Sequence, residues 1–319
     1  MTVLSIIIPF YGQTSDELAT PLNSIANQQN VDFSHFDVHL VNDGGPAIDE
    51  KSLIASYPTL QLTLHQYSEN LGAGLARQYG IDHSGGEWVT FIDADDRLYG
   101  SFALAPIVNL PEDFPFELLL CDFFLQRLGD NGQINEIRYR GDKNGLDYLH
   151  AKSFKRSLLD TYNIRFHPDI QNMAEDFYFR TFVTLFAKSA SLYEPIYEHL
   201  YNPNSLTTKW DNKTKVFLEV RARRLILEKI EEWKPETLQK EFNICFARLF
   251  FTMKRFGTTD EAPFWEELQV FVQEWRNLFE SHRTEIFQQM QKTARENFPG
   301  IPTADFKDFY KRCQALLRN

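Results

Sequence analysis

The chain has 319 residues, of which 43% are hydrophobic, and a formal net charge of −11. This length allows one large domain or two modest ones, and the negative charge gives no general attraction to nucleic acid or anionic lipid. The three cysteines, Cys121, Cys245 and Cys313, are odd in number and far apart, which fits neither a disulfide framework nor a zinc site and favours a reducing compartment.

The hydrophobic segments in this sequence are too short for a membrane span or a signal sequence. No run approaches the roughly 20 apolar residues of a membrane span. The N-terminal run VLSIIIPF is shorter than a signal sequence and lacks its basic lead-in. We therefore expect a soluble cytoplasmic protein.

Four strand patterns occupy the first hundred residues. Each is a short run rich in β-branched, leucine or aromatic residues that ends at a turn-forming residue, and together they cover 3–8, 36–43, 60–67 and 86–93. Helical patterns lie between them, one over 18–25 with Thr20 as N-cap and Pro21 as first residue, another over about 74–81. Because strands that alternate with helices form parallel sheets covered on both faces, we predict an α/β fold.

The pattern changes in the middle of the chain. Residues 116–140 predict two strands joined at Asp130-Asn131-Gly132, a strong hairpin signal. A helix and a further strand follow, at 171–188 and 189–200. Long amphipathic helices dominate from about residue 211. We therefore predict a mixed α/β domain over 1–210 and a helical region over 211–319.

Polar residues gather where the predicted strands end. In open α/β sheets, ligands bind beyond the carboxyl ends of the strands, so these residues are expected to share one rim. They are Pro9, Tyr11, Asp43, Asn70, Asp93 and Asp95. Tyr11 could stack on a nucleotide base and Asp43 could accept hydrogen bonds from it, although each is also an ordinary turn residue.

The acidic sequence Asp93-Ala-Asp95 is a candidate cation site. Residues i and i+2 of an extended strand point to the same side, so the two carboxylates can hold one Mg²⁺ or Mn²⁺ ion together with substrate phosphates. Aspartate-rich turns that cap a helix give the same pattern, and Asp96 is expected to be such a cap. His199, beside a polar loop, could touch phosphate or metal, or be structural.

The segment Gly72-Ala-Gly74 resembles a dinucleotide-binding loop but departs from it. Arg77 occupies the position of the third glycine, and the segment follows the third strand instead of the first, which disfavours a NAD-dependent dehydrogenase. We interpret the glycines as a flexible approach to a ligand and Arg77 as a guanidinium for a diphosphate. A solvated position for Arg77 is the alternative.

Glu175 and Asp176 form an acidic pair near a helix start. Adjacent helical residues diverge by about 100°, so one carboxylate can face the rim while the other supports it. The aromatic residues that follow could raise the pKa of a carboxylate towards that of a general base. An acidic pair favoured by the helix dipole gives the same sequence.

Five of these segments come in a recognisable order. SIIIPFY, VNDGG, NLGAGLARQYGI, GEWVTFIDADD and AEDFYFR follow one another as in inverting GT-A glycosyltransferases of family 2, which the chain resembles over about residues 3–210. Its layout is also similar to that of cytoplasmic wall-teichoic-acid glycosyltransferases, whose helical C-terminal region serves oligomerisation. One departure is Asn42, which replaces the first aspartate of the family's aspartate-aspartate-glycine-serine pattern.

The resemblance implies a GT-A fold and transfer from a nucleotide sugar, usually a UDP-sugar. It places Pro9, Tyr11 and Asp43 near the base, and Asn70, Arg77 and Asp93 elsewhere on the donor. It makes Asp93 and Asp95 the DxD element, with Asp95 the direct ligand of Mn²⁺ or Mg²⁺. It makes Asp176 the catalytic base, supported by Glu175.

The resemblance leaves the acceptor and the assembly open. A cell-surface glycan or polyol-phosphate is the expected acceptor, and a glycoprotein or a modified phage DNA base is an alternative, with unmodified nucleic acid not expected. The C-terminal helices could form a homo-oligomer or dock on the inner face of a membrane. A nucleotidyltransferase is disfavoured because PFYGQT lacks a glycine-rich basic loop, and an inactive binding module because the acidic residues are intact.

Overall fold

The computed structural model describes residues 2–129, 132–141, 148–170, 174–203, 216–257, 261–297 and 300–318. The chain divides into two compact units, Met1–Thr208 and Lys209–Asn319. None of the helices in these described ranges is both long and apolar enough to cross a membrane. All three cysteines are buried free thiols.

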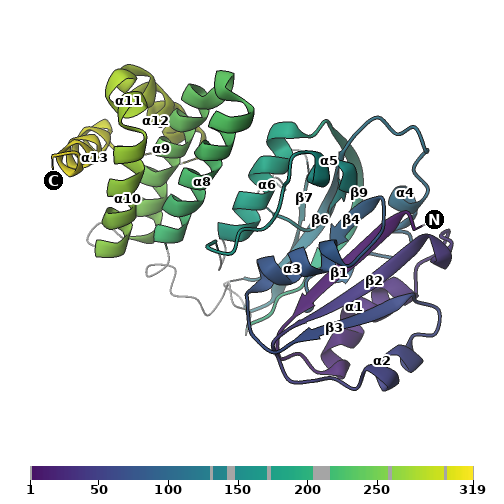
Figure 1. Ribbon diagram of the computed structural model, residues 1–319. Helices are drawn as coiled ribbons and strands as arrows, with labels where there is room; N and C mark the ends of the chain where they lie inside the picture. The colour runs from purple at the N-terminus through teal and green to yellow at the C-terminus, as the bar shows by residue number, and fades with distance from the viewer. Residues whose placement is uncertain are drawn as a thin grey trace. The chain divides into compact units, whose positions relative to one another are not determined.

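The first unit is built on a mixed sheet with strand order β3-β2-β1-β4-β8-β6-β9-β5, and β7 pairs with β6 (Figure 1). The strands are β1 (Leu4–Phe10), β2 (Phe36–Asp43), β3 (Leu62–Tyr67), β4 (Trp88–Phe91), β5 (Arg97–Leu98), β6 (Leu118–Leu128), β7 (Ile134–Tyr139), β8 (Lys152–Lys155) and β9 (Ser189–His199). The first four are parallel to one another, and β8 runs antiparallel to β4. The two strands predicted within 116–140 are confirmed as an antiparallel pair, while Asp130 and Asn131 lie outside the described residues.

Helices cover both faces of this sheet. They are α1 (Ser15–Ala26), η1 (Phe33–His35), α2 (Glu50–Ser56), α3 (Ala73–Asp82), α4 (Ala105–Val108), α5 (Arg156–Thr161) and α6 (Ala174–Phe186). Alternate residues of β1 face opposite sides, so Ile6 and Ile8 share a core with α1, whereas Ile7 packs against Gly80 of α3. The predicted α/β class with a mixed sheet is confirmed.

The predicted start of α1 is wrong. Thr14 is the N-cap, and its side chain and that of Glu17 form a capping box with the backbone of the first turn. Pro21 lies inside the helix, not at its first position. The sequence Thr-x-x-Glu is itself a helix-start signal, and it decides the start here over the Thr-Pro pair.

The second unit is helical. Its elements are α8 (Phe217–Trp233), η2 (Pro235–Thr237), α9 (Leu238–Phe256), α10 (Ala262–Glu274), α11 (Arg276–Ser281), α12 (Arg283–Asn297) and α13 (Thr303–Leu316). Phe246 of α9 lies at the centre of an aromatic core, with Phe279, Phe309 and Tyr310 around it. Burial of aromatic rings on this scale supplies the unit with a core of its own.

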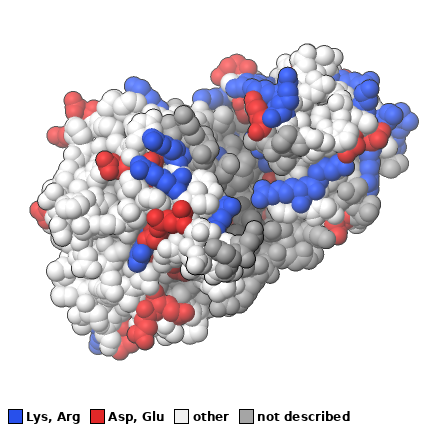
Figure 2. Space-filling view, turned by 180° about the vertical axis from the view of Figure 1, so that it is seen from behind, with Lys and Arg blue, Asp and Glu red and all other residues white. Residues whose placement is uncertain are grey.

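Charge is divided unequally between the units. The first 208 residues contain 27 acidic and 13 basic residues, whereas residues 209–319 contain 17 acidic and 20 basic ones. Figure 2 shows many Lys and Arg side chains on one face of the helical unit. Arg221 and Arg224 of α8 form ion pairs with Glu267 and Glu274 of α10. The net negative charge therefore resides in the sheet unit alone.

Candidate active site

The predicted rim residues lie at the carboxyl ends of the parallel strands. Pro9 pairs with Val41 near the ends of β1 and β2. Asp43 is the last residue of β2. Tyr11 is 58% exposed and follows the end of β1. Asn70, in the turn before α3, is also exposed. These positions leave Tyr11 and Asn70 accessible to a ligand, whereas Asp43 is buried.

Asp43 holds the turn that leads into α3. Its carboxylate accepts hydrogen bonds from the Tyr67 hydroxyl at 2.8 Å and from the backbone N–H groups of Leu71 and Gly72 at 2.8 and 2.9 Å. Gly72 has φ +91°, a backbone conformation that favours glycine. Asp43 thus organises the turn that carries Asn70, a structural role that the sequence did not suggest.

Arg77 is the centre of the site. Its side chain is only 7% exposed, and its guanidinium donates to Asp93 Oδ1 at 2.7 Å and to Asp176 Oδ1 at 2.9 Å. One arginine therefore joins the acidic element after β4 to the first turn of α6. The solvated alternative for Arg77 is wrong, and part of the positive charge among the carboxylates comes from the protein itself.

The pKa values of the two carboxylates bound by Arg77 are shifted in opposite directions. Burial opposes ionisation of Asp93, but Arg77 and the nearby His150 and His199 outweigh it, so the pKa of Asp93 lies below its usual value. At Asp176, burial raises the pKa above the usual range despite the attraction of Arg77. A carboxylate with a raised pKa is suited to accept a proton near neutral pH.

Gly74 permits a close approach between α3 and α6. A Cβ atom at this position would lie 3.0 Å from both Cβ and Cγ of Glu175 and 3.1 Å from a ring carbon of Phe166. Glu175 is buried at this contact. The interpretation of Gly74 as flexible backbone for a ligand is therefore wrong, because this glycine is needed for helix packing.

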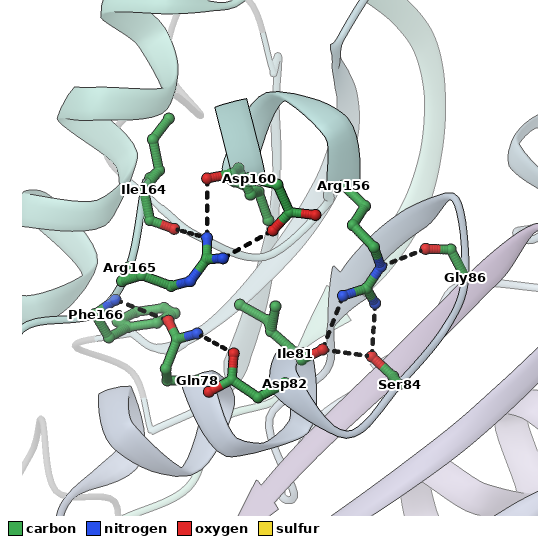
Figure 3. Close-up of polar contacts among 11 residues, drawn as sticks. Gln78, Ile81, Asp82, Ser84, Gly86, Arg156, Asp160, Ile164, Arg165 and Phe166 are labelled. Carbon is green, nitrogen blue, oxygen red and sulfur yellow. Dashed lines mark hydrogen bonds and ion pairs between the residues drawn. The ribbon is translucent and has the colours of Figure 1, made fainter. Parts of the chain in front are cut away.

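A network of polar contacts anchors the C-terminal end of α3 (Figure 3). The guanidinium of Arg156, at the start of α5, donates to the carbonyls of Gly86 and Ile81 and to the Ser84 hydroxyl. Gln78 accepts from the backbone N–H of Phe166. These bonds fix α3, and with it Arg77, against the segment that precedes α6.

Asp96 does not cap a helix, contrary to our prediction. Its fully buried carboxylate accepts from the Tyr197 hydroxyl at 2.6 Å, from the Leu200 N–H at 2.9 Å, and lies 2.8 Å from His199 Nδ1. The Tyr197 hydroxyl also accepts from the N–H of Asp93 at 3.2 Å. Asp96 therefore ties the end of β9 to the acidic element.

Asp95 and His199 occupy the same neighbourhood. The carboxylate of Asp95 accepts from Asn202 Nδ2 at 2.8 Å. Burial disfavours protonation of His199, but its contact with Asp96 and the charges of Asp93 and Asp95 outweigh burial and raise its pKa. The strand that ends at His199 thus lies beside the acidic element, and the role of His199 toward phosphate or metal stays a prediction.

His150 is a site residue that the sequence analysis missed. It is buried, and its side chain together with those of Asp96 and His199 offers ligand atoms within 4.8 Å of one another. Burial holds the pKa of His150 well below its ordinary value, so the ring is neutral. It lies 54 positions from Asp96 in sequence, and only the pairing of β8 with β4 brings the two together.

Comparison with known proteins assigns the family. The model of Glycosyl transferase family 2 matches residues 5–175, which is more than half of the chain. The chain belongs to glycosyl transferase family 2. The matched region spans most of β1, the strands β2 to β8, the Asp93–Asp95 element and Arg77, and it ends at Glu175, before β9.

A curated glycosyltransferase is similar to part of this chain. The uncharacterised glycosyltransferase YibD of Escherichia coli is 30% identical over 155 residues, which are 46% of this chain and 42% of YibD. The matched region is thus less than half the length of this curated relative.

Solved structures share the family 2 fold. S. aureus TarS 1-349 in complex with UDP-GlcNAc has a TM-score of 0.69 at 17% identity, covering 99% of this chain and 91% of that one. The mannosyltransferase PcManGT of Pyrobaculum calidifontis, in complex with GDP-Man and Mn²⁺, has a TM-score of 0.50 at 15% identity, covering 98% and 85%. At these identities the likeness confirms the GT-A fold that we predicted.

Proposed function

We propose that this chain is an inverting, cation-dependent glycosyltransferase that transfers a sugar from a nucleotide-sugar donor to a hydroxyl group of an acceptor. The observation that carries the proposal is the arginine bridge. One buried guanidinium binds Asp93 of the acidic element and Asp176 of α6, 83 residues apart in sequence. These two ion pairs fix the position of Asp176, the proposed base, relative to Asp93, which is proposed to lie near the donor.

Asp176 is the base in this proposal. Its side chain is 35% exposed, so an acceptor hydroxyl can reach it, and its pKa is raised by burial. The hydroxyl gives its proton to Asp176 as it attacks the anomeric carbon on the face opposite the departing nucleoside diphosphate, and the configuration inverts. Glu175, buried against Gly74, holds this turn of α6 in position.

A divalent cation, Mn²⁺ or Mg²⁺, fits the residues around the acidic element. Asp95, Asp93 and His199 offer carboxylate and imidazole ligands, and His150 adds a buried ring nitrogen with no hydrogen-bond partner among the described residues. When bound, the ion neutralises the charge that develops on the diphosphate leaving group. Arg77 contributes a fixed positive charge from the protein.

The residues proposed to bind the donor lie at the carboxyl ends of the parallel strands. The exposed ring of Tyr11 stacks on the base beside Pro9, and the turn held by Asp43 presents Asn70. A UDP-sugar is the favoured donor, supported by the fold shared with TarS and its complex with UDP-GlcNAc. The helical unit has 20 basic and 17 acidic residues, and this small positive excess favours a polyol-phosphate or other anionic glycan as acceptor, at the cytoplasmic side of the membrane.

The decisive experiment follows nucleoside diphosphate release from a panel of nucleotide sugars, with Mn²⁺ and with chelator. Asp176→Asn is expected to lower turnover by a factor of about 10²–10⁴ and to leave donor binding, measured by thermal shift, unchanged. Asp169→Asn is the matched control, because its side chain is 70% exposed on the segment before α6. Wild-type turnover in Asp176→Asn would reject the proposal.

A further inference from the structure

A groove lies between α1 and the segment that follows the acidic element, and we call it the α1 groove. Its volume is about 670 Å³, within the range of pockets that hold small ligands. One wall is a face of α1 that carries Thr20, Asn23 and Asn27, and the other is formed by residues 97–101 together with Glu198. All of these residues belong to the sheet unit.

Hydrogen bonds tie the two walls of the α1 groove together. The Ser24 hydroxyl accepts from the N–H of Leu98 at 3.0 Å, and Gln28 Nε2 donates to the carbonyl of Gly100 at 2.8 Å. Because both walls are held in this way, the groove exists before a ligand arrives, and binding costs little ordering of the protein.

Polar side chains of the α1 groove are available to a ligand. Thr20, Asn23 and Asn27 are exposed, and their spacing of three and four residues places them on one face of the helix. Within the described ranges, neither Thr20 nor Asn27 uses its side chain in a hydrogen bond. Hydroxyl and amide side chains both donate and accept, so they match the hydroxyl groups of a sugar, which also do both.

Tyr99 adds an aromatic surface to the groove. It is 36% exposed, and its ring packs against that of Phe124 with 4.5 Å between the centroids. Its backbone N–H donates to the carbonyl of Ile196 at 3.0 Å. A ring held in this way supplies rigid, amphipathic contact area at low entropic cost, which suits the C–H face of a sugar ring.

The charged residues of the α1 groove form an ion pair with each other. Arg97 Nε donates to Glu198 Oε2 at 2.7 Å, and Glu198 Oε1 accepts from Gln126 Nε2 at 2.7 Å. Both oxygens of this buried carboxylate are therefore engaged. Clefts that attract a charged ligand are lined by one sign of charge, so the balanced pair favours an uncharged ligand.

The α1 groove adjoins the proposed active site but is separate from it. Arg97 pairs with Glu198 across β5 and β9, and the residues next to them, Asp96 and His199, are in contact at the acidic element. Successive residues of a strand face opposite sides of a sheet, so the groove lies on the other face. Because β5 is the last strand in the sheet order, one sheet edge separates the two.

We propose that the α1 groove binds a chain of uncharged sugar residues. That these sugars belong to the acceptor glycan rests on the proposed function, whereas binding itself requires neither donor nor metal. The groove then holds a part of the glycan at a distance from the reacting hydroxyl. Glycans long enough to occupy both places bind more tightly than short ones.

The test is an NMR titration of the ²H,¹⁵N-labelled full chain, without donor or metal. The probes are cellotetraose, maltotetraose and N-acetylchitotetraose, with a glycerol phosphate tetramer as the anionic comparison. At about 10 mM, at least one neutral tetrasaccharide is expected to shift the side-chain amide signals of Asn23 and Asn27. Asn27→Ala and Tyr99→Ala should each weaken this binding about twofold to tenfold, by the loss of one hydrogen bond or one aromatic contact.

Asn135→Ala is the matched control, because Asn135 is an exposed asparagine on β7, outside the groove. Should Tyr99→Ala fail to fold, Asn27→Ala still tests the groove, since it replaces an exposed helical residue with a better helix former.

The inference is overturned if no neutral tetrasaccharide shifts these signals, or if the shifts are confined to the rim around Asn70. It is also overturned if the glycerol phosphate tetramer binds the groove at least as tightly as every neutral probe. Sugar binding in the groove of a chain that transfers no sugar refutes only the proposed function, whereas transfer without binding in the groove refutes only this inference.

Discussion

Gly74→Ala tests whether the spacing of α3 and α6 controls catalysis. The new Cβ would lie 3.0 Å from two carbons of Glu175, whereas carbon atoms prefer about 3.5–4.0 Å, so the helices must separate by about 0.5–1 Å. Overpacking of this kind costs about 1–3 kcal/mol, and the better helix propensity of alanine returns up to about 1 kcal/mol. The protein should therefore fold, with a net loss of stability of about 0–3 kcal/mol.

The catalytic effect of Gly74→Ala should exceed its effect on stability. Displacement of Glu175 moves the neighbouring Asp176, and a misplacement on the order of 1 Å can cost about a hundredfold in rate. We expect kcat to fall by about 10–100-fold, with donor KM little changed. Gly85→Ala is the control, since nothing lies within 4 Å of its added Cβ. Wild-type kcat in Gly74→Ala would refute the reasoning.

Two further predictions concern stability. Arg77→Met leaves Asp93 and Asp176 without their shared cation, so the free energy of unfolding in urea should fall by about 3 kcal/mol. This value is near the lower end for buried pairs because both carboxylates are about a third exposed. An unchanged urea midpoint would contradict a stabilising role for the two ion pairs of Arg77. Burial beside His39 and His83 lowers the pKa of His65 to about 4 from 6.5. As the pH falls, His65 therefore takes up a proton in the unfolded chain before it does so in the folded protein. The free energy of unfolding should fall between pH 6.5 and about pH 4, and His65→Gln should make that decrease smaller.

The order of strands and helices could be predicted from the sequence. Periodicity and turn residues marked β1, β2 and β3, because β1 and β2 are buried strands and β3 alternates between buried and exposed positions. Pro9 does not end β1, contrary to the prediction, because the strand continues through it to Phe10. The start of α1 was misjudged, since the Thr20-Pro21 pair was given more weight than the capping box of Thr14 and Glu17. Two local signals competed for the start of this helix, and the hydrogen bonds of the Thr14–Glu17 capping box determine where it begins.

The candidate site was predicted in part. Asp93, Arg77 and Asp176 were identified by type and position, and the structure brings them into one ion-pair network. The missed features are tertiary. His150 and the contact of Gly74 with Glu175 join segments 54 and 101 residues apart, and no local pattern encodes which strand pairs with β4.

Because β8 runs antiparallel to β4, the rim of the sheet is built from two independent parts of the chain. The parallel strands and the turns after them carry Asp43, Asn70 and Asp93. Position 150 enters from an independent piece of chain, which contributes a side chain without supporting the acidic turn. A substitution at position 150 therefore changes the surroundings of the acidic element while the parallel strands that carry Asp43 and Asp93 stay intact.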